Sequence, residues 1–137
     1  MYYLLDTNIC VFYLRGKLNF NQFISVPWRE NCCISEITIL ELRYGAENSN
    51  QPQRHHQAVD AFLYGLTVIP IVKVIDTYTK EKVRLRKMGT PINDEFDLII
   101  GASAIANDLI LVTDNAKHFV NFENLKIENW LDKSKLS

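Results

Sequence analysis

The chain has 137 residues, of which 47% are hydrophobic, so it can form one compact domain with a substantial core and needs no second one. Its 15 basic and 16 acidic residues give a formal net charge of -1, which excludes a strongly basic surface as the means of holding nucleic acid. We expect one domain over residues 1–131, followed by a polar tail over 132–137.

The cysteine content favours a reducing compartment. Cys10, Cys32 and Cys33 form an odd set without C-x-x-C spacing, so neither a disulfide framework nor a zinc site is predicted. No apolar run approaches the ~18 residues of a membrane-spanning helix, and no basic segment precedes an apolar stretch that could serve as an export signal. We therefore expect a cytoplasmic protein.

Short apolar runs predict strands, and apolar residues at helical spacing predict the helices between them. In chain order, we expect a strand at 2–5, helices at 9–14 and 19–26, a strand at 32–34, a helix at 36–44, a loop at 47–54, a helix around 58–63, a strand at 67–72, helices at 75–88 and 95–106, a strand at 109–112 and a short helix at 117–119. Ser35 is a good N-cap for the helix after it, and Gly45 a good end for that helix. Pro70 indicates that pairing of the third strand ends early. A last apolar pair, Leu125 and Ile127, lies near the end of the domain.

This alternation of strands and helices predicts an α/β fold, with a three-layer sandwich in which helices flank a mainly parallel central sheet. No internal repeat or low-complexity linker divides the chain. In such sheets, ligands bind beyond the carboxyl ends of the strands. Polar residues that follow a predicted strand are therefore the first candidates for a functional site.

Acidic and amide side chains stand where this architecture can bring them together. Asp6 follows the first strand, Glu41 lies within a helix, and Asp97 lies at the start of another helix. Asp114 and Asn115 follow the fourth strand. Two structural alternatives stay open, because Asp6 can cap the helix after it and Asp97 can complement the positive end of its own helix.

Glu41 is the least easily explained of these acids. It falls within an apolar stripe formed by Ile37, Leu40 and Tyr44 at helical spacing. A carboxylate on the core side of a helix is costly unless it is paired or bound to a metal. The alternative is a salt bridge at the edge of the stripe.

If Asp6, Glu41 and Asp97 converge, their charges need compensation. Two carboxylates about 4 Å apart repel by roughly 4 kcal/mol at an effective dielectric constant of about 20. A divalent cation is the simplest remedy, and ligands that are all oxygen select Mg²⁺ or Mn²⁺ rather than zinc or copper. Such a site suits hydrolysis of phosphoesters, in which the ion polarises the phosphate and activates a water molecule.

Five stretches, in this order, resemble the PIN-domain family and in particular its VapC-like toxins. They are LLDTN at 4–8, ISEITILELRYGA at 34–46, the segment 89–104 that contains FDLIIGA, LVTDNAKHF at 111–119 and LKIENW at 125–130. The resemblance implies a PIN-like fold and an Mg²⁺- or Mn²⁺-dependent endoribonuclease that acts as the toxin of a toxin–antitoxin pair. It also implies an RNA substrate, a cognate VapB-like antitoxin and a homodimer.

The resemblance also assigns site residues by position. The residues that match the family's three metal-site acids are Asp6, Glu41 and Asp97. Many members carry a fourth acid two residues after a threonine, where this chain has Asn115, and its own acid, Asp114, comes one residue earlier. The segment before the third acid is one residue longer than usual, so Asp94 is a second candidate for that position. Thr7 and Thr113 are candidates to hydrogen-bond the acids or a phosphate, although both are ordinary helix-entry residues.

Three further groups have alternative interpretations. A helical face that could follow an RNA backbone, or simply be solvated, carries Lys80, Arg84 and Lys87. The histidines, for which we predict surface or packing roles rather than catalysis, are His55, His56 and His118. Residues that either pack in the core or stay exposed as an antitoxin or dimer surface are Phe12, Tyr13, Leu14, Phe20 and Phe23.

Two other function classes share part of this pattern of acidic residues. A phosphohydrolase of the haloacid-dehalogenase type also has an aspartate after its first strand, but it needs a second acid two residues later, where this chain has Asn8. A catalytically degenerate PIN-like module that binds RNA or protein without cutting stays open, because Asn115 stands where many members have an acid.

Overall fold

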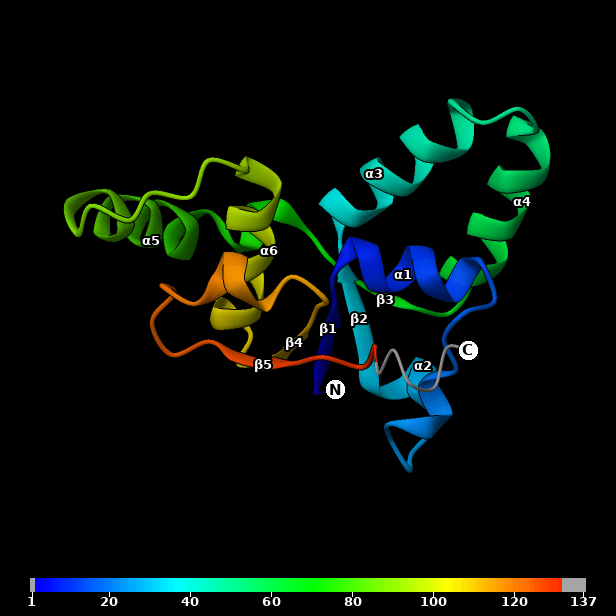
Figure 1. Cartoon of the computed structure of the whole chain (residues 1–137), viewed down its shortest axis with the longest axis horizontal. Helices are drawn as coiled ribbons and strands as arrows, with labels where there is room; N and C mark the ends of the chain where they lie inside the picture. The colour runs from blue at the N-terminus through cyan, green and yellow to red at the C-terminus, as the bar shows by residue number, and fades with distance from the viewer. Residues whose placement is uncertain (1, 132–137) are drawn as a thin grey trace.

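The computed structural model describes residues 2–131, which fold around one five-stranded sheet (Figure 1). The strands are β1 Tyr3–Leu5, β2 Cys32–Ser35, β3 Thr67–Ile69, β4 Ile110–Val112 and β5 Lys126–Glu128. Their order is β3-β2-β1-β4-β5, and every neighbouring pair is parallel. The expectation of a mainly parallel sheet is confirmed, and over the described residues the sheet is wholly parallel.

Helices cover both faces of the sheet. They are α1 Thr7–Leu14, α2 Trp28–Asn31, α3 Glu36–Glu47, α4 Pro52–Leu63, α5 Ile75–Lys87 and α6 Glu95–Ala106, with single 3-10 turns at Phe20–Gln22, Ile71–Lys73 and Ala116–Phe119. Figure 1 shows α1, α3 and α4 on one side of the sheet and α5 and α6 on the other. Within residues 2–131, no helix is both long and apolar enough to span a bilayer.

Two hydrophobic cores lie on opposite faces of the sheet. Adjacent residues of a strand point to opposite faces, so Leu5 packs in the core beside α1, whereas Leu4 packs in the core beside α5 and α6. Ile34 and Cys33 of β2 divide in the same way. Because both faces are covered, the strands are continuously apolar rather than alternating. This arrangement confirms the expected three-layer sandwich.

The topology places the ends of β1 and β4 side by side. β1 lies at the centre of the sheet, with β2 and β3 on one side and β4 and β5 on the other. The chain thus reverses its direction of progress between β1 and β4, and such a switch point leaves a crevice at the carboxyl ends of the two strands. Asp6 follows β1 and Thr113 follows β4, so both stand at this crevice.

The helix expected at 19–26 is wrong. Only a single 3-10 turn forms at Phe20–Gln22, where the Asn19 side chain accepts a hydrogen bond from the backbone N of Asn21 at 3.0 Å. Phe20 and Ile24 are nevertheless buried, so their apolar spacing reflects separate contacts of an irregular segment with the core. The helix in this region is α2, which begins after Pro27.

Two helix boundaries and one strand also differ from the sequence-based expectation. α3 continues through Gly45, where we expected it to end, and α4 begins at Pro52, within the expected loop. Proline suits the first helical position because its missing N–H would have no partner there. β5 was not predicted, since it is a three-residue edge strand in which only Ile127 is partly buried.

Candidate active site

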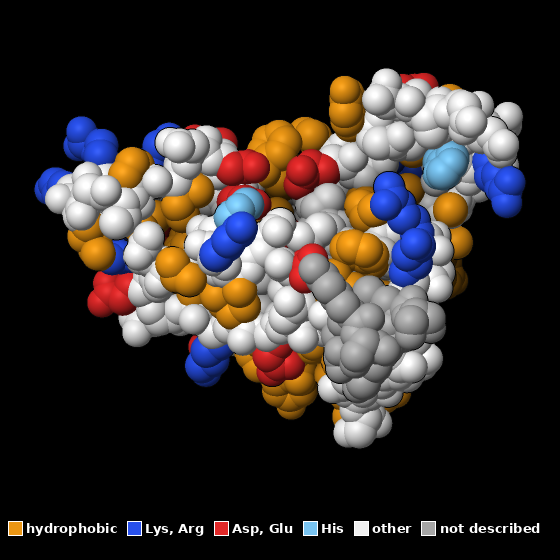
Figure 2. All heavy atoms as spheres, viewed as in Figure 1, with side chains coloured by type: hydrophobic (Ala, Val, Ile, Leu, Met, Phe, Trp, Pro, Cys, Tyr) orange, Lys and Arg blue, Asp and Glu red, His pale blue; other side chains and the backbone are white. Residues whose placement is uncertain are grey.

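A cavity of about 430 Å³ opens at the crevice between β1 and β4. Its polar lining comes from five places: Asp6, Thr7 and Asn8 after β1, Arg15 at the end of α1, Glu41 on α3, Asp94 and Asp97 at the start of α6, and Asn115 and His118 after β4. Figure 2 shows acidic side chains gathered near the centre of the molecule, between α6 and α1. We call this space the acidic cavity.

Asp6 is held in place by two hydrogen bonds. Its Oδ1 accepts from the backbone N of Thr7 at 2.8 Å, which makes it the N-cap of α1, and its Oδ2 accepts from Thr113 Oγ1 at 2.7 Å. Asp6 is only 4% exposed. Burial raises the pKa of its carboxyl group, the two hydrogen bonds oppose that rise, and Asp97 and Asp94 add to it. Asp6 therefore both caps the helix and lines the cavity.

Glu41 reaches the acidic cavity from α3. Its Oε1 accepts a hydrogen bond from Thr7 Oγ1 at 2.7 Å, and Thr7 Oγ1 lies 3.1 Å from Thr38 Oγ1. Burial is the main cause of the raised pKa of Glu41, the bond from Thr7 lowers it, and the acids across the cavity, Asp6 first, raise it again. A chain of hydroxyl groups thus links α1 and α3 beside the two carboxylates.

The prediction that Ile37, Leu40 and Tyr44 form a core-facing stripe with Glu41 within it is wrong. Leu40 and Tyr44 are 52% and 70% exposed, so the stripe that contains them does not face the core. The buried residues of α3 are Ile37, Thr38, Leu42 and Ala46. Glu41 lies beside Thr38 and Leu42 at the edge of this buried side, which directs it to the start of α1. The salt-bridge alternative also fails, since Glu41 has no ion pair among residues 2–131.

Asp97 lies in the first turn of α6 and pairs with a histidine. Its Oδ2 is 3.1 Å from His118 Nδ1, and its side chain is 16% exposed. Burial raises the pKa of Asp97, the contact with His118 lowers it, and Asp94 raises it. For His118 we expected only a surface or packing role. Its position three residues after Asn115, in the turn Ala116–Phe119 that follows β4, was the signal that could have placed it at the site.

Asp94 also belongs to the acidic cavity. Its Oδ1 accepts from the backbone N of Phe96 at 2.9 Å and of Asp97 at 3.3 Å, so Asp94 is the N-cap of α6. The extra residue in this segment therefore adds an acid to the lining while Asp97 keeps its place in the helix. Both candidates for the third acid line the cavity.

Of the two candidates after β4, the structure brings only Asn115 to the acidic cavity. Asn115 lines the cavity, and its backbone N donates to Thr113 Oγ1 at 3.0 Å. Asp114 is not part of the lining. Its Oδ1 accepts from Asn129 Nδ2 at 3.1 Å, beyond the end of β5.

The donors in the acidic cavity fit a hard cation by their chemistry. Four carboxylates share the space, and Asn8 is also part of its lining. The buried Oδ1 of Asn8 has no hydrogen-bond partner among the described residues. The acids raise one another's pKa, as like charges do when no counterion separates them. Within residues 2–131, however, no three His, Cys, Asp or Glu side chains already form a group that could hold one ion. A cation would have to draw together carboxylates that are now bound separately to threonines and a histidine.

Residues 3–125 match the PIN domain, and this match spans most of the chain. The chain therefore belongs to the PIN-domain family, as the five stretches of the sequence indicated. Its all-parallel sheet and the acids at the carboxyl ends of the strands are features of the described structure that agree with this assignment.

Within that family, the chain is similar to VapC ribonucleases. It is 32% identical over 136 residues to the tRNA(fMet)-specific endonuclease VapC of Shigella flexneri, a match that covers 93% of this chain and 97% of the relative. It is 34% identical over 133 residues to Ribonuclease VapC2 of Rickettsia felis, with 95% and 98% covered.

Solved structures give the same result for the fold. The structure of DNA-bound VapBC from Salmonella typhimurium matches with a TM-score of 0.84 and 31% identity, over 96% of this chain and 99% of that one. VapBC2 from Rickettsia felis, bound to a DNA fragment from its promoter, also matches with a TM-score of 0.84, at 33% identity, over 96% and 100%.

Proposed function

We propose that this protein is an Mg²⁺- or Mn²⁺-dependent endoribonuclease that acts as the toxin of a toxin–antitoxin pair. The observation that supports this most directly is the acidic cavity, where carboxylates from three distant segments share one space with Asn8, whose buried Oδ1 has no hydrogen-bond partner among the described residues. The relatives named as VapC ribonucleases support the choice of RNA as substrate.

The proposed ion ligands are Asp6, Glu41 and Asp97, with Asp94 beside them. When bound, the ion would polarise a phosphodiester group and lower the pKa of a water molecule that attacks it. The chain's own contribution is to hold the ligands in position. Thr113 fixes Asp6 through Oδ2, and Thr7 fixes Glu41 through Oε1, so each hydroxyl group holds the orientation of one carboxylate.

Asn115 and His118 complete the proposed site. Asn115 has an amide that can donate a hydrogen bond to a phosphate oxygen, which a carboxylate at that position could not do. His118 holds Asp97 Oδ2 on the side of the cavity nearest the turn after β4. We assign Asp114 no role in catalysis, because its side chain bonds to Asn129 outside the cavity.

The proposed partners follow from the relatives. Matching structures are VapBC complexes, which favours a VapB-like antitoxin protein as the inhibitor of this chain. We expect such a toxin to act on RNA in the cytoplasm, a reducing compartment in which thiols stay reduced. Cys10, Cys32 and Cys33 are all free and buried, which agrees with this expectation. A homodimer is part of the same proposal.

A second candidate function is a PIN-like module that binds RNA or protein without cutting it. Two observations favour it: Asn115 in place of an acid, and the absence of a ready-made ion site among residues 2–131. The two functions differ in one measurable property, because only the nuclease releases new RNA ends.

The test is cleavage by the purified chain. Total RNA and initiator tRNA, chosen because one relative is named for tRNA(fMet), are incubated with Mg²⁺, with Mn²⁺ or with EDTA. We expect cleavage with either ion and none with EDTA, and a loss of more than about 100-fold for Asp6→Asn. Asp108→Asn is the matched control, because Asp108 is remote from the cavity and its positive φ of 51° suits asparagine. Cleavage that persists in EDTA would overturn the metal mechanism.

A further inference from the structure

Two more cavities adjoin the acidic cavity, one on each side. A groove of about 300 Å³ lies between α1, α3 and α4 and shares Val11, Arg15 and Glu41 with the acidic cavity. A cavity of about 480 Å³ lies at the loop before α6 and shares Asp94, Asp97 and His118 with it. We call them the apolar groove and the loop-side cavity. Because each of them shares three lining residues with the acidic cavity, we call the three cavities together the trough.

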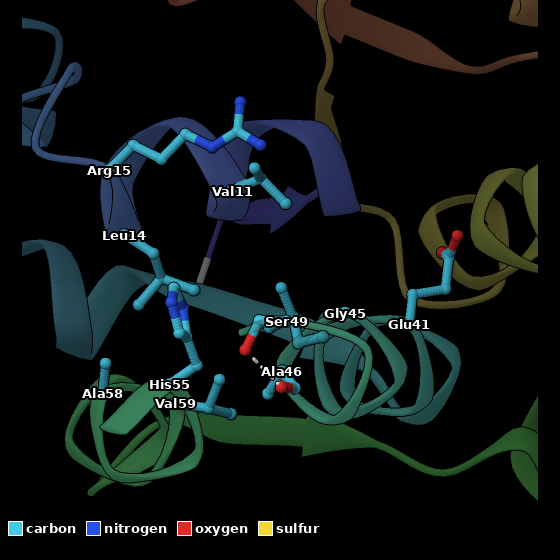
Figure 3. Close-up of a pocket in the computed structure, with 11 residues that line it drawn as sticks. Val11, Leu14, Arg15, Glu41, Gly45, Ala46, Ser49, His55, Ala58 and Val59 are labelled. Carbon is cyan, nitrogen blue, oxygen red and sulfur yellow. Dashed lines mark hydrogen bonds between the residues drawn. The ribbon is translucent and has the colours of Figure 1, made fainter. Parts of the chain in front are cut away.

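The apolar groove has a mainly aliphatic floor, with Ser49 and His55 also in its lining, and a charged residue at each end. Val11 and Leu14 of α1 face Ala58 and Val59 of α4 across it. Figure 3 shows Arg15 extending from α1 at one end of this groove, while Glu41 lies at the other end. A flat aromatic group can be buried on such a floor while charged groups stay at the rim.

Each flank of the trough carries a cation without a partner. The lysine and arginine side chains in the linings of the three cavities are Arg15, which lines both the apolar groove and the acidic cavity, and Lys117, in the loop-side cavity. Both are exposed, and neither has an ion pair or side-chain hydrogen bond within residues 2–131. By contrast, the Arg84 side chain of α5 is bound to Glu81 and Glu123. Arg15 and Lys117 are thus free to bind anionic groups on either side of the acids.

We propose that this trough binds a single-stranded segment of RNA. The scissile phosphate lies at the acidic cavity, Arg15 and Lys117 bind the phosphates on either side, and one unstacked base lies in the apolar groove. A net charge of -1 gives the protein no general attraction for RNA. The attraction must be local, from Arg15 and Lys117 together with the divalent ion proposed at the acids. A paired and stacked duplex could not place a base in the groove, which selects single strands. This inference rests on the proposed function.

The first test measures RNA affinity in the absence of cleavage. A fluorescein-labelled single-stranded RNA is bound to the Asp6→Asn chain with Mg²⁺ present, and the affinity is followed as the salt concentration rises. Because each phosphate contact to a single strand contributes roughly 0.7 to the slope of log K against log salt, Arg15→Gln and Lys117→Gln should each lower that slope by about this amount. Lys87→Gln removes an exposed cation outside the trough and should leave the slope unchanged. Equal slopes in all three variants would overturn the assignment of the cations.

The second test fills the apolar groove. Ala58 is exposed on α4, so Ala58→Phe blocks the groove without disturbing the core. Gln57→Phe adds the same ring at an exposed position of that helix outside the groove lining. We expect Ala58→Phe to weaken binding roughly fivefold with an unchanged salt slope, and Gln57→Phe to have no effect. Circular dichroism shows whether both variants are folded.

Three outcomes would overturn this part of the proposal. The first is that Ala58→Phe binds RNA as tightly as the chain with an unfilled groove. The second is that the unfilled groove binds a hairpin duplex as tightly as a single strand, and the third is that Ala58→Phe loses binding to a protein partner but keeps its affinity for RNA. The last would assign the groove to a protein. A chain that binds RNA as expected but never cuts it would contradict the proposed nuclease and leave the binding path supported.

Discussion

Asp6 shows that one side chain can serve the fold and the site with opposing energetic effects. As the N-cap of α1, it satisfies a backbone N–H and lies at the positive end of the helix, which is stabilising. Its burial among Asp94 and Asp97 disfavours the charged form, which is why its pKa is raised. The hydrogen bond that caps α1 needs only an oxygen acceptor at position 6. The negative charge of Asp6 is needed only if Asp6 binds an ion.

We therefore expect Asp6→Asn to be more stable than the wild type at neutral pH without divalent ions. Asparagine retains an acceptor for Thr7 N, and its amide can donate to Thr113 Oγ1, while the buried charge is lost. The gain should be about 0.5–2 kcal/mol, or about 2–6 °C in Tm. Thermal unfolding in EDTA measures it, with Asp108→Asn as the control. A lower Tm would show that the charge of Asp6 stabilises the fold.

Thr113 gives a second prediction at this scale. Its hydroxyl donates to Asp6 Oδ2 and accepts from Asn115 N, so Thr113→Val removes both contacts without changing the side-chain shape. Because groups that orient metal ligands typically contribute 10- to 100-fold, we expect an activity loss of about that size and a higher Mg²⁺ requirement. Thr79→Val, on an exposed part of α5, should leave both unchanged. Full activity of Thr113→Val would show that Asp6 needs no such support.

At the scale of elements, the sequence predicted those features that depend on residues close together in the chain, such as helix caps and polar residues at strand ends. Ser35 was expected to cap α3, and its Oγ accepts from Ile37 N at 3.1 Å. The acid after β1 was found because a polar residue at a strand end needs only local evidence. The turn that carries His118 could not be placed against Asp97, because their contact depends on how two elements pack.

Glu41 illustrates the same limit more sharply. Glu41 lies in the lining of the acidic cavity, yet the stripe used to predict its direction was wrong. A helix with apolar residues on more than one side has no unique buried face in its sequence, and α3 leaves Leu40 and Tyr44 exposed. The packing of α3 against α1 and α4 decides which side is buried.

Two helical glycines make a matched test of packing against helix propensity. A Cβ added to Gly101 of α6 would lie 2.6 Å from Phe122 Cζ, whereas one added to Gly45 of α3 would meet nothing within 4 Å. Alanine improves helix propensity by about 1 kcal/mol at both positions, but overpacking against a buried ring costs about 1–3 kcal/mol. We expect Gly45→Ala to stabilise by about 1 kcal/mol and Gly101→Ala to destabilise by up to about 2 kcal/mol. Urea unfolding measures the free energy of unfolding of both variants. A Gly101→Ala variant as stable as the wild type would show that Phe122 can move to make room for the added methyl group.

At the scale of the whole molecule, the topology concentrates like charges while the total charge stays near zero. The central position of β1 brings together segments far apart in the chain, and the acids they carry share one cavity. The basic residues that bring the formal charge to -1 lie mostly elsewhere, and at the cavity itself the four carboxylates outnumber Arg15, the one lysine or arginine in its described lining. The stability of the fold should therefore depend on pH and on divalent ions through this one place.

The sign of the pH effect follows from the raised pKa values of Asp6, Glu41 and Asp97. Above the ordinary values of 3.8 and 4.5, the folded state binds more protons than the unfolded state, so the stability from these groups is present at lower pH and is lost as pH rises through the folded-state pKa values. The wild type should thus lose stability relative to the Asp6→Asn, Glu41→Gln double variant as pH rises from about 4, until the acids are fully ionised.

A divalent ion should reverse this loss in the wild type alone. At a concentration 100 times its Kd, an ion that binds only the folded state stabilises it by about 2.7 kcal/mol, or about 10 °C in Tm for a domain of this size. Thermal unfolding of both proteins from acid to neutral pH, with Mg²⁺ and with EDTA, tests the two effects together. Asp108→Asn should follow the wild type throughout. Parallel curves for the wild type and the double variant would mean that the acids are not coupled, and an equal Mg²⁺ effect in both would place the ion elsewhere.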